Sequence, residues 1–231
     1  MDTLVRGEGK PLVLLHGYLS SKESFYYQTE FFSKFFKVYA PDLPGFKENY
    51  LPYPYALKDY AAIVDGFLDE VLKETGEKSA NVLAHSFGAR IVFYLSPSNK
   101  FDRIVLTGAA GVRTRKKLSV KLKIATYKFV KRHFHKSIKR FESPDYKALS
   151  PVMRQSFNKI IAEDLTNKLL FIDNKTLIVN GKTDKETPPK TAKIINKKIK
   201  NSQLIFLEGA GHFCFVDEPQ RFNAAVKEFL S

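Results

Sequence analysis

Short apolar runs alternate along the chain with longer stretches of helical periodicity. Each run has four to six residues, is rich in Val, Ile and Leu, and is followed by a glycine, a proline or a polar residue. Such runs are typical of strands buried on both faces, as in a parallel sheet. We therefore expect strands at Pro11–Leu15, Lys37–Ala40, Ser79–Ala84, Arg103–Thr107, Thr176–Asn180 and Gln203–Leu207.

Apolar residues spaced three and four positions apart predict helices between these strands. One such helix covers Ala56–Leu72, and Gly76 is expected to end it. Strand–helix alternation implies right-handed crossovers and an α/β fold with a doubly wound, mostly parallel sheet. Ligands of such sheets lie beyond the carboxyl ends of the strands. The other predicted helices are Phe87–Leu95, Ala192–Ile199 and Pro219–Leu230.

The alternation is interrupted between two of the predicted strands. Residues 112–168 show helical periodicity but no strand pattern. A helical insertion of this size is expected to form a cap over the carboxyl edge of the sheet. The prediction is therefore a core made of residues 1–111 and 169–231, and a helical cap made of residues 112–168.

The strongest local motif is Ala84–Gly88, in which Ser86 lies between a predicted strand and a predicted helix. The pattern small-x-Ser-x-small is typical of a nucleophile elbow, here with Ala84 where glycine is usual. Small residues two positions before and after the serine are a steric need of such a tight turn. The turn lifts the hydroxyl above the sheet, and the helix N-terminus adds a partial positive charge. Ser86 is therefore the predicted nucleophile, and the alternative is a buried turn serine.

A serine hydroxyl needs a base to become a good nucleophile, and the chain has five histidines. His212 is favoured because it lies in a glycine-rich loop just after the last predicted strand. His133 and His135 lie in a lysine-rich helical stretch, where solvation is the simpler expectation. His16 is expected to shape a loop, and His85 to point sideways into the fold.

The imidazole in turn needs a carboxylate that fixes its tautomer. Asp184 follows the predicted strand Thr176–Asn180 and lies between Ser86 and His212 in sequence. The chain order serine, acid, histidine is the order expected for this type of fold. Glu208 and Asp173 are the alternative acids.

Two backbone N–H groups are expected to stabilise the oxyanion of an acyl-transfer reaction. One belongs to Phe87, which directly follows the predicted nucleophile. The other is expected in the loop after the first long strand, where Gly17 allows the chain to present the N–H of Tyr18. Leu19 is the second choice for this position.

These motifs together resemble the α/β-hydrolase superfamily over almost the whole chain. The resemblance rests on PLVLLHGY at 11–18, PDLPGF at 41–46, VLAHSFGAR at 82–90, LIVNGKTD at 177–184 and GAGHF at 209–213. It is closest to the small capped esterases and lipases of bacteria. It implies a nucleophile at Ser86, an acid at Asp184, a base at His212 and a loop-organising role for Asp42. Only ten residues precede Pro11, so a sheet shortened at its N-terminal edge is expected.

The charge of the chain is concentrated in one segment. The 231 residues have a net charge of +14, but Arg113–Arg140 holds twelve basic residues and no acid, so the remainder has only +2. An apolar stripe in this segment is expected to pack on the core, with the lysines in water. An alternative is a peripheral contact with an anionic membrane. Steering of anionic substrates or binding of nucleic acid is a further alternative. Nucleic acid is the weakest of these because no binding motif accompanies the charge.

The predicted function is hydrolysis of a carboxylic ester, with a small ester or a lipid as substrate, and needs no metal or organic cofactor. A carbon–carbon bond hydrolase, a thioesterase, an aminopeptidase and a non-catalytic lipid-binding module remain as alternatives. A single cysteine, Cys214, excludes an internal disulfide framework. The apolar run Leu12–Leu15 is too short for a secretory signal, so a cytoplasmic protein is expected.

Overall fold

A computed structural model describes residues 1–46, 51–113 and 149–231. Its centre is a seven-stranded sheet in the order β1-β3-β2-β4-β5-β6-β7. All neighbouring strands are parallel except β1, which pairs antiparallel with β3. The strands are β1 (Thr3–Arg6), β2 (Pro11–Leu15), β3 (Lys37–Pro41), β4 (Ala80–His85), β5 (Phe101–Thr107), β6 (Thr176–Gly181) and β7 (Ser202–Leu207).

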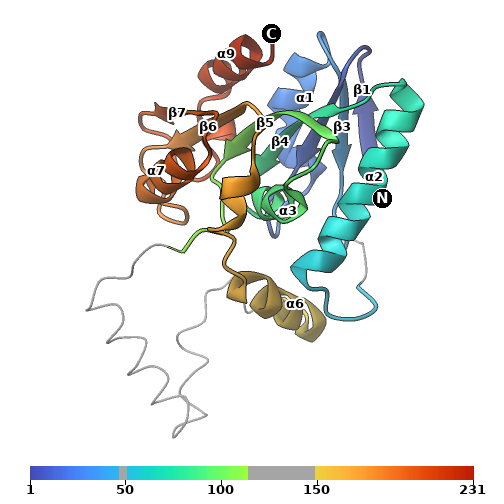
Figure 1. Cartoon of the computed structure of the whole chain (residues 1–231), viewed down its shortest axis with the longest axis vertical. Coiled ribbons are helices and arrows are strands. Elements are labelled where there is room, and N and C mark those ends of the chain that lie inside the picture. The colour runs from blue at the N-terminus through green and yellow to red at the C-terminus, as the bar shows by residue number, and fades with distance from the viewer. Residues whose placement is uncertain (47–50, 114–148) are drawn as a thin grey trace, which may run out of the picture.

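Helices cover both faces of the sheet, which gives three layers (Figure 1). Helices α2, α3 and α7 lie on one face, and α1, α8 and α9 lie on the other. Side chains that alternate along the central strands point into two separate apolar cores, as Val13 and Leu14 do. The described helices are α1 (Tyr26–Phe32), α2 (Leu57–Thr75), α3 (Phe87–Leu95), α6 (Pro151–Ala162), α7 (Pro189–Lys198), α8 (Cys214–Asp217) and α9 (Pro219–Leu230), with 3-10 turns at Lys22–Phe25 and Lys168–Phe171.

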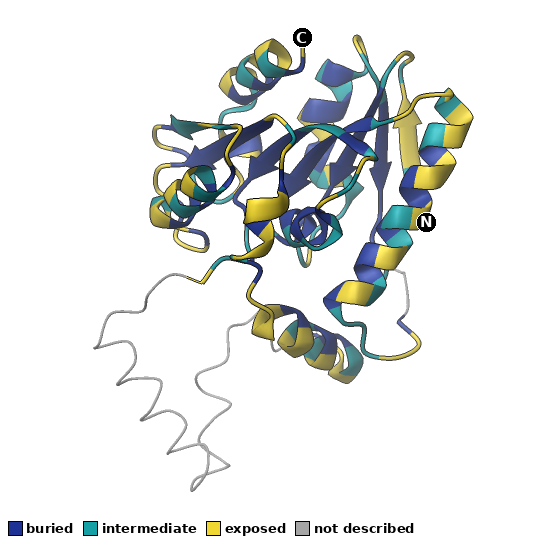
Figure 2. Ribbon diagram, in the orientation of Figure 1, coloured by how far each residue is buried: buried dark blue, intermediate teal, exposed yellow. Residues whose placement is uncertain are grey.

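The fold class predicted from the sequence is confirmed. All six predicted strands are present, and one short strand, β1, precedes Pro11 at the edge of the sheet. The predicted end of α2 is also confirmed, because Gly76 caps that helix with φ of 71°. Strands β2, β4 and β6 are buried along their whole length (Figure 2). Helix α1 was not predicted.

The strand order reverses between β2 and β4, and this places two loops side by side. From β2 the chain continues to β3 on one side, and it then crosses back to β4 on the other side of β2. A reversal of this kind is the place where sheets of this type bind their ligands. Tyr18 lies in the loop after β2, and Ser86 lies in the turn between β4 and α3.

Most of the predicted cap, residues 114–148, lies outside the described residues, so the division into core and cap stays a prediction. The described part contains α6, which begins at Ser150, whose hydroxyl accepts from the N–H of Met153. Tyr18 donates its hydroxyl proton to the Met153 carbonyl at 3.0 Å. Arg90 of α3 donates to the Ile160 carbonyl at 2.8 Å. Helix α6 is thus tied to the loop after β2 and to α3, at the carboxyl edge of the sheet.

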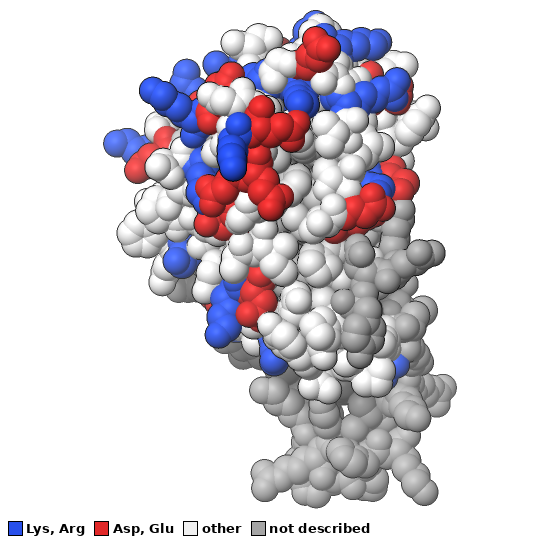
Figure 3. Space-filling model, turned by 90° about the vertical axis from the view of Figure 1, so that its right-hand side faces the viewer, with Lys and Arg blue, Asp and Glu red and all other residues white. Residues whose placement is uncertain are grey.

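Basic and acidic side chains are interspersed over the face that carries α2 (Figure 3). Lys100 contacts both Asp65 and Asp69 of this helix, at 2.9 and 2.8 Å, and Lys37 contacts Glu74 at 2.6 Å. This surface fits the near-neutral balance that the sequence predicts outside Arg113–Arg140. The basic segment Arg113–Arg140, apart from Arg113, lies outside the described residues.

Candidate active site

The turn between β4 and α3 holds Ser86 in a strained conformation. Ser86 has φ of 49° and ψ of −102°, a region that residues with a Cβ rarely adopt. A Cβ at Gly88 would lie 2.3 Å from the Leu15 carbonyl oxygen, so α3 can approach β2 this closely only with glycine there. This geometry is the strand–turn–helix expected of a nucleophile elbow, and it leaves Ser86 partly exposed at the carboxyl edge.

The loop after β2 passes directly beside this turn. A Cβ at Gly17 would lie 3.4 Å from the Ser86 Cβ and 2.7 Å from Nδ1 of His85. The Tyr18 ring packs edge-on against Phe87, with centroids 5.5 Å apart. Phe87 is the first residue of α3, so its N–H has no acceptor within the helix. The two predicted oxyanion donors therefore belong to adjacent segments, and their role stays a prediction.

Asp184 and His212 meet in a buried hydrogen bond. Nδ1 of His212 lies 2.9 Å from Oδ2 of Asp184, and these side chains are 9% and 0% exposed. Their loops are pressed together, since a Cβ at Gly181 would lie 2.1 Å from the Gly211 carbonyl oxygen. Thr183 also donates to the Ala210 carbonyl from both its N–H and its hydroxyl, at 3.0 and 2.8 Å. The structure thus brings together the predicted acid and the predicted base.

Hydrogen bonds keep the Asp184 carboxylate ionised. Burial opposes ionisation, but the hydrogen bonds from His212 and Thr187 outweigh it and hold the pKa of Asp184 below its usual range. The Thr187 hydroxyl donates to Oδ2 at 2.7 Å, and the N–H groups of Glu186 and Thr187 donate to Oδ1 at 2.8 and 2.9 Å. A carboxylate can only accept, so Nδ1 of His212 carries the proton and Nε2 remains available as a base.

The contacts of Thr187 were not predicted from the sequence. Its hydroxyl contacts Asp184 and lies 3.3 Å from Nδ1 of His212. An aspartate followed three residues later by threonine favours a turn in which side chain and backbone bond locally. This spacing is visible in the sequence, but it does not predict that the Thr187 hydroxyl contacts the Asp184 carboxylate.

His85 is buried beside His212 and is not placed to act as a base. Its Nε2 lies 3.2 Å from the carbonyl oxygen of His212, to which it must donate, and the two rings are 4.7 Å apart. Its Nδ1 is buried without a hydrogen-bond partner in the described part of the chain. Burial, helped by the nearby His212, lowers the pKa of His85 to about 3. The neutral ring of His85 therefore stabilises the position of the His212 backbone through this hydrogen bond.

His16 also serves structure rather than proton transfer. Its Nδ1 donates to the Gly17 carbonyl at 2.8 Å, and its Nε2 accepts from the Leu43 N–H at 2.9 Å. Asp42 accepts from the Lys22 N–H at 2.8 Å. Both side chains join the loops that follow β2 and β3, as the sequence predicted. The two remaining histidines, His133 and His135, lie outside the described residues.

Ser86 and His212 approach the same short segment after β5. The Ser86 N–H donates to the Thr107 carbonyl at 3.0 Å, and its carbonyl accepts from the Ala110 N–H at 3.2 Å. A Cβ at Gly108 would lie 3.0 Å from the His212 ring. Among the described residues, no hydrogen bond joins the Ser86 hydroxyl to His212. Such bonds are often long before substrate binds.

The alternative acids lie elsewhere. Glu208 forms an exposed ion pair with Lys182 at 2.6 Å. Asp173 precedes β6, at the amino edge of the sheet.

Within the described residues, no three His, Cys, Asp or Glu side chains are placed to hold a metal ion. None of the described helices has the length and apolar character needed to cross a bilayer.

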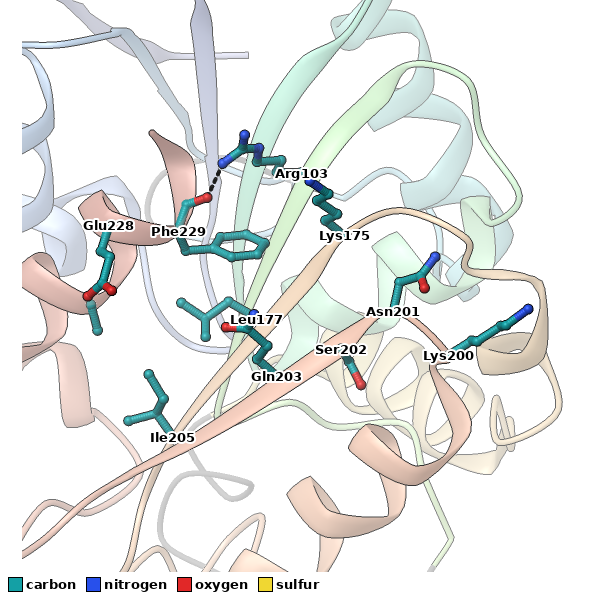
Figure 4. Close-up of a pocket in the computed structure, with 11 residues that line it drawn as sticks. Arg103, Lys175, Leu177, Lys200, Asn201, Ser202, Gln203, Ile205, Glu228 and Phe229 are labelled. Atoms are coloured by element: carbon teal, nitrogen blue, oxygen red, sulfur yellow. Dashed lines mark hydrogen bonds between the residues drawn. The ribbon is translucent and has the colours of Figure 1, made fainter.

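A cavity of about 650 Å³ opens at the amino edge, far from Ser86 in the fold (Figure 4). It lies between α9 and the beginnings of β5, β6 and β7. Its arginine, Arg103, is already engaged, because it donates to the Phe229 carbonyl at the end of α9. The cavity is therefore separate from the site formed by Ser86, Asp184 and His212, which lies at the carboxyl edge.

The family model of the alpha/beta hydrolases matches residues 12–225. The chain belongs to the alpha/beta hydrolase family. Pimeloyl-[acyl-carrier protein] methyl ester esterase of Nitrosospira multiformis is 23% identical over 96% of this chain and 95% of that protein. 2-Hydroxy-6-oxo-2,4-heptadienoate hydrolase of Pseudomonas putida is 22% identical over 97% and 90%. An esterase from Exiguobacterium antarcticum has a similar structure, with a TM-score of 0.75, 25% identity and coverage of 99% and 95%. These relatives support hydrolase activity for this family member.

Proposed function

We propose that this alpha/beta hydrolase cleaves a carboxylic ester through an acyl-enzyme intermediate, with Ser86 as nucleophile, His212 as base and Asp184 as the acid that orients it. The observation that carries the proposal is the buried Asp184–His212 hydrogen bond of 2.9 Å. The strained backbone of Ser86 supports it independently, because strain of this kind is typical of functional turns.

In the first half-reaction, Nε2 of His212 takes the proton of the Ser86 hydroxyl while Oγ attacks the ester carbonyl carbon. The N–H groups of Phe87 and Tyr18 hold the resulting oxyanion, and the developing imidazolium is stabilised by Asp184. His212 then gives its proton to the alcohol oxygen as the bond between that oxygen and the carbonyl carbon breaks. The alcohol leaves, and the acyl group stays on Oγ.

In the second half-reaction, a water molecule takes the place of the alcohol. His212 removes one of its protons as the water oxygen attacks the acyl carbonyl carbon. The second tetrahedral intermediate collapses, the Oγ–carbon bond breaks, and the serine hydroxyl recovers its proton from His212. The carboxylic acid is released, and this chemistry uses side chains and backbone amides alone.

Other reactions fit the same residues. One relative is named as a heptadienoate hydrolase, which keeps a carbon–carbon bond hydrolase as the second candidate. A thioesterase, an aminopeptidase or a non-catalytic lipid-binding module of this fold would need no different positions for these residues. A relative named as a methyl ester esterase favours the ester reaction as the first choice.

Replacement of Ser86 by alanine tests the proposal. Hydrolysis of p-nitrophenyl esters by Ser86→Ala should fall by several orders of magnitude, because loss of a triad member typically costs that much. The circular dichroism spectrum and thermal unfolding should stay close to those of the wild type. Hydrolysis by the alanine variant at the wild-type rate would show that the nucleophile is another group.

Two further proposals concern the surroundings of the enzyme. A small ester or a lipid is the proposed substrate, and the basic segment Arg113–Arg140 is the proposed contact for an anionic membrane. Binding to anionic vesicles at low salt tests that contact, and its absence there would end the membrane proposal. A cytoplasmic location stays a prediction from the sequence.

A further inference from the structure

The loop that carries Asp184 places a second carboxylate beside the imidazole of His212. Oε2 of Glu186 lies 3.6 Å from Nε2 of His212, on the side of the ring opposite Asp184. The backbone of Glu186 is fixed by the same acid, since its N–H donates to Oδ1 of Asp184 at 2.8 Å. The Glu186 side chain is 71% exposed, so it lies at the mouth of the site and contacts solvent.

The part of the chain that the structure describes supplies no cation that pairs with this carboxylate. Within the described residues, Glu186 forms no ion pair with a lysine or an arginine. The adjacent Lys185 is exposed, and Lys182 is engaged with Glu208 at 2.6 Å. Glu186 therefore places a negative charge close to the nitrogen that moves protons.

The reaction itself decides which part of a substrate meets this charge. Nε2 of His212 must approach the alcohol oxygen within hydrogen-bond distance to protonate it, so the alcohol portion of the ester has to lie on the Nε2 side of the ring. Glu186 lies on that same side, whereas the acyl carbonyl is directed at the N–H groups of Phe87 and Tyr18. A charge on the alcohol portion would consequently interact with Glu186 over a few ångströms.

We infer that Glu186 is a specificity-determining residue, which makes the enzyme favour esters with a cationic alcohol portion and disfavour those with an anionic one. The inference rests on the proposed ester hydrolysis and adds a substrate class to it. Two unit charges about 6 Å apart, in surroundings between water and a protein surface, change a rate by about three- to tenfold. The effect is expected in kcat/KM and should be opposite in sign for the two kinds of ester.

Three aryl acetates test this inference: meta-trimethylammoniophenyl acetate, meta-tert-butylphenyl acetate, which has the same shape without the charge, and meta-sulfonatophenyl acetate. Each kcat/KM is divided by that of the neutral ester, and the ratio is compared between variants, so intrinsic reactivity cancels. The variants are Glu186→Gln and Glu186→Lys. Glu77→Gln is the matched control, because Glu77 is exposed before β4 at the opposite edge of the sheet.

For Glu186→Gln, the ratio for the cationic ester should fall by about three- to tenfold and the ratio for the anionic ester should rise by a similar factor. Glu186→Lys should roughly square both changes, and Glu77→Gln should leave both ratios unchanged. A role in loop structure alone would lower all three rates together and leave the ratios constant, which would overturn the inference. Wild-type protein that hydrolyses none of the three esters would instead contradict the proposed function, and this inference with it.

Discussion

The two edges of the central sheet differ in what their loops contain. At the carboxyl edge, Ser86 and Leu19 have positive φ values of 49° and 58°, and the charged side chain of Asp184 is fully buried. At the amino edge, the chain uses exposed ion pairs such as Lys37–Glu74, and no non-glycine residue described there has positive φ.

This difference shows where the fold accepts unfavourable local structure. Strained backbone and buried charge each destabilise the folded state, so they persist only where surrounding contacts hold them. The carboxyl edge supplies those contacts through the close approaches of Gly88 to Leu15 and of Gly181 to Gly211. Substitutions at the carboxyl edge should accordingly lower the activity. Substitutions at the amino edge should have little effect on either activity or stability.

The largest expected effect is that of Asp184→Asn. An amide in place of the carboxylate no longer fixes the tautomer of His212, so kcat should fall by about 10⁴-fold. The same substitution at the amino edge, Asp173→Asn, is the control and should leave kcat unchanged. Steady-state kinetics with a p-nitrophenyl ester measures both, and equal loss in the two variants would contradict the distinction between the edges.

A second effect should appear in the pH dependence of stability, through His85. Burial lowers the pKa of His85 from its usual 6.5 to about 3, so between these pH values the unfolded chain binds a proton that the folded chain does not. The folded state is therefore most stable, as far as His85 is concerned, above pH 6.5, and this stability is lost as the pH falls toward 3. The free energy of unfolding should decline by up to about 1.4 kcal/mol per pH unit in this window on account of His85 alone.

Urea unfolding of the wild type and of His85→Phe between pH 4.5 and 7 measures this slope. The phenylalanine variant cannot take up the proton, so its stability should decline less steeply over that range. Contributions of the carboxylates cancel in the difference between the two proteins. Parallel slopes would mean that His85 is protonated in the folded state as easily as in the unfolded chain.

A smaller effect is expected from Thr187→Val, which keeps the shape but removes the hydroxyl bonded to Asp184. Loss of one such hydrogen bond should lower kcat by about three- to tenfold. The KM should change little, because the hydroxyl contacts the acid and not the substrate. Thr187→Ser retains the hydroxyl and should recover most of the rate, and a serine variant as slow as the valine variant would assign the effect to packing.

The smallest effect is expected at the amino edge, from Lys37→Met. Its partner Glu74 has a side chain that is 53% exposed, so water screens the pair. The free energy of unfolding should change very little, with kcat unchanged. Chemical denaturation and the esterase assay measure the two quantities, and a loss of activity would show that this edge is coupled to the site.

The sequence predicted those parts of the site that depend on chain order. Ser86, Asp184 and His212 each follow a strand, and parallel strands bring their carboxyl ends to one edge whatever the loops do in detail. The positions of Thr187 and Glu186 beside His212 were not predicted, because they depend on how a short loop turns around Asp184. Their distances to His212 are set by that turn and not by their spacing in the sequence.

The helices also differ in how far the sequence pattern predicted them. Helix α2 was predicted because its apolar residues recur regularly, whereas α1 contains the adjacent Phe31 and Phe32, followed by Phe35 and Phe36. Paired aromatics on several sides obscure a helical period, so pattern alone did not distinguish a short helix from a loop. Helix α1 forms because Phe25 and Phe32 become fully buried against the sheet and α8.

The most direct test of the central claim is the site at which a fluorophosphonate probe bonds to the protein. Mass spectrometry of digested wild-type protein should find the adduct on Ser86. Ser86→Ala should show no adduct, and labelling of His212→Gln should be slower by orders of magnitude, because the hydroxyl then lacks its base. An adduct on another residue, or labelling that is equally fast without His212, would contradict the account.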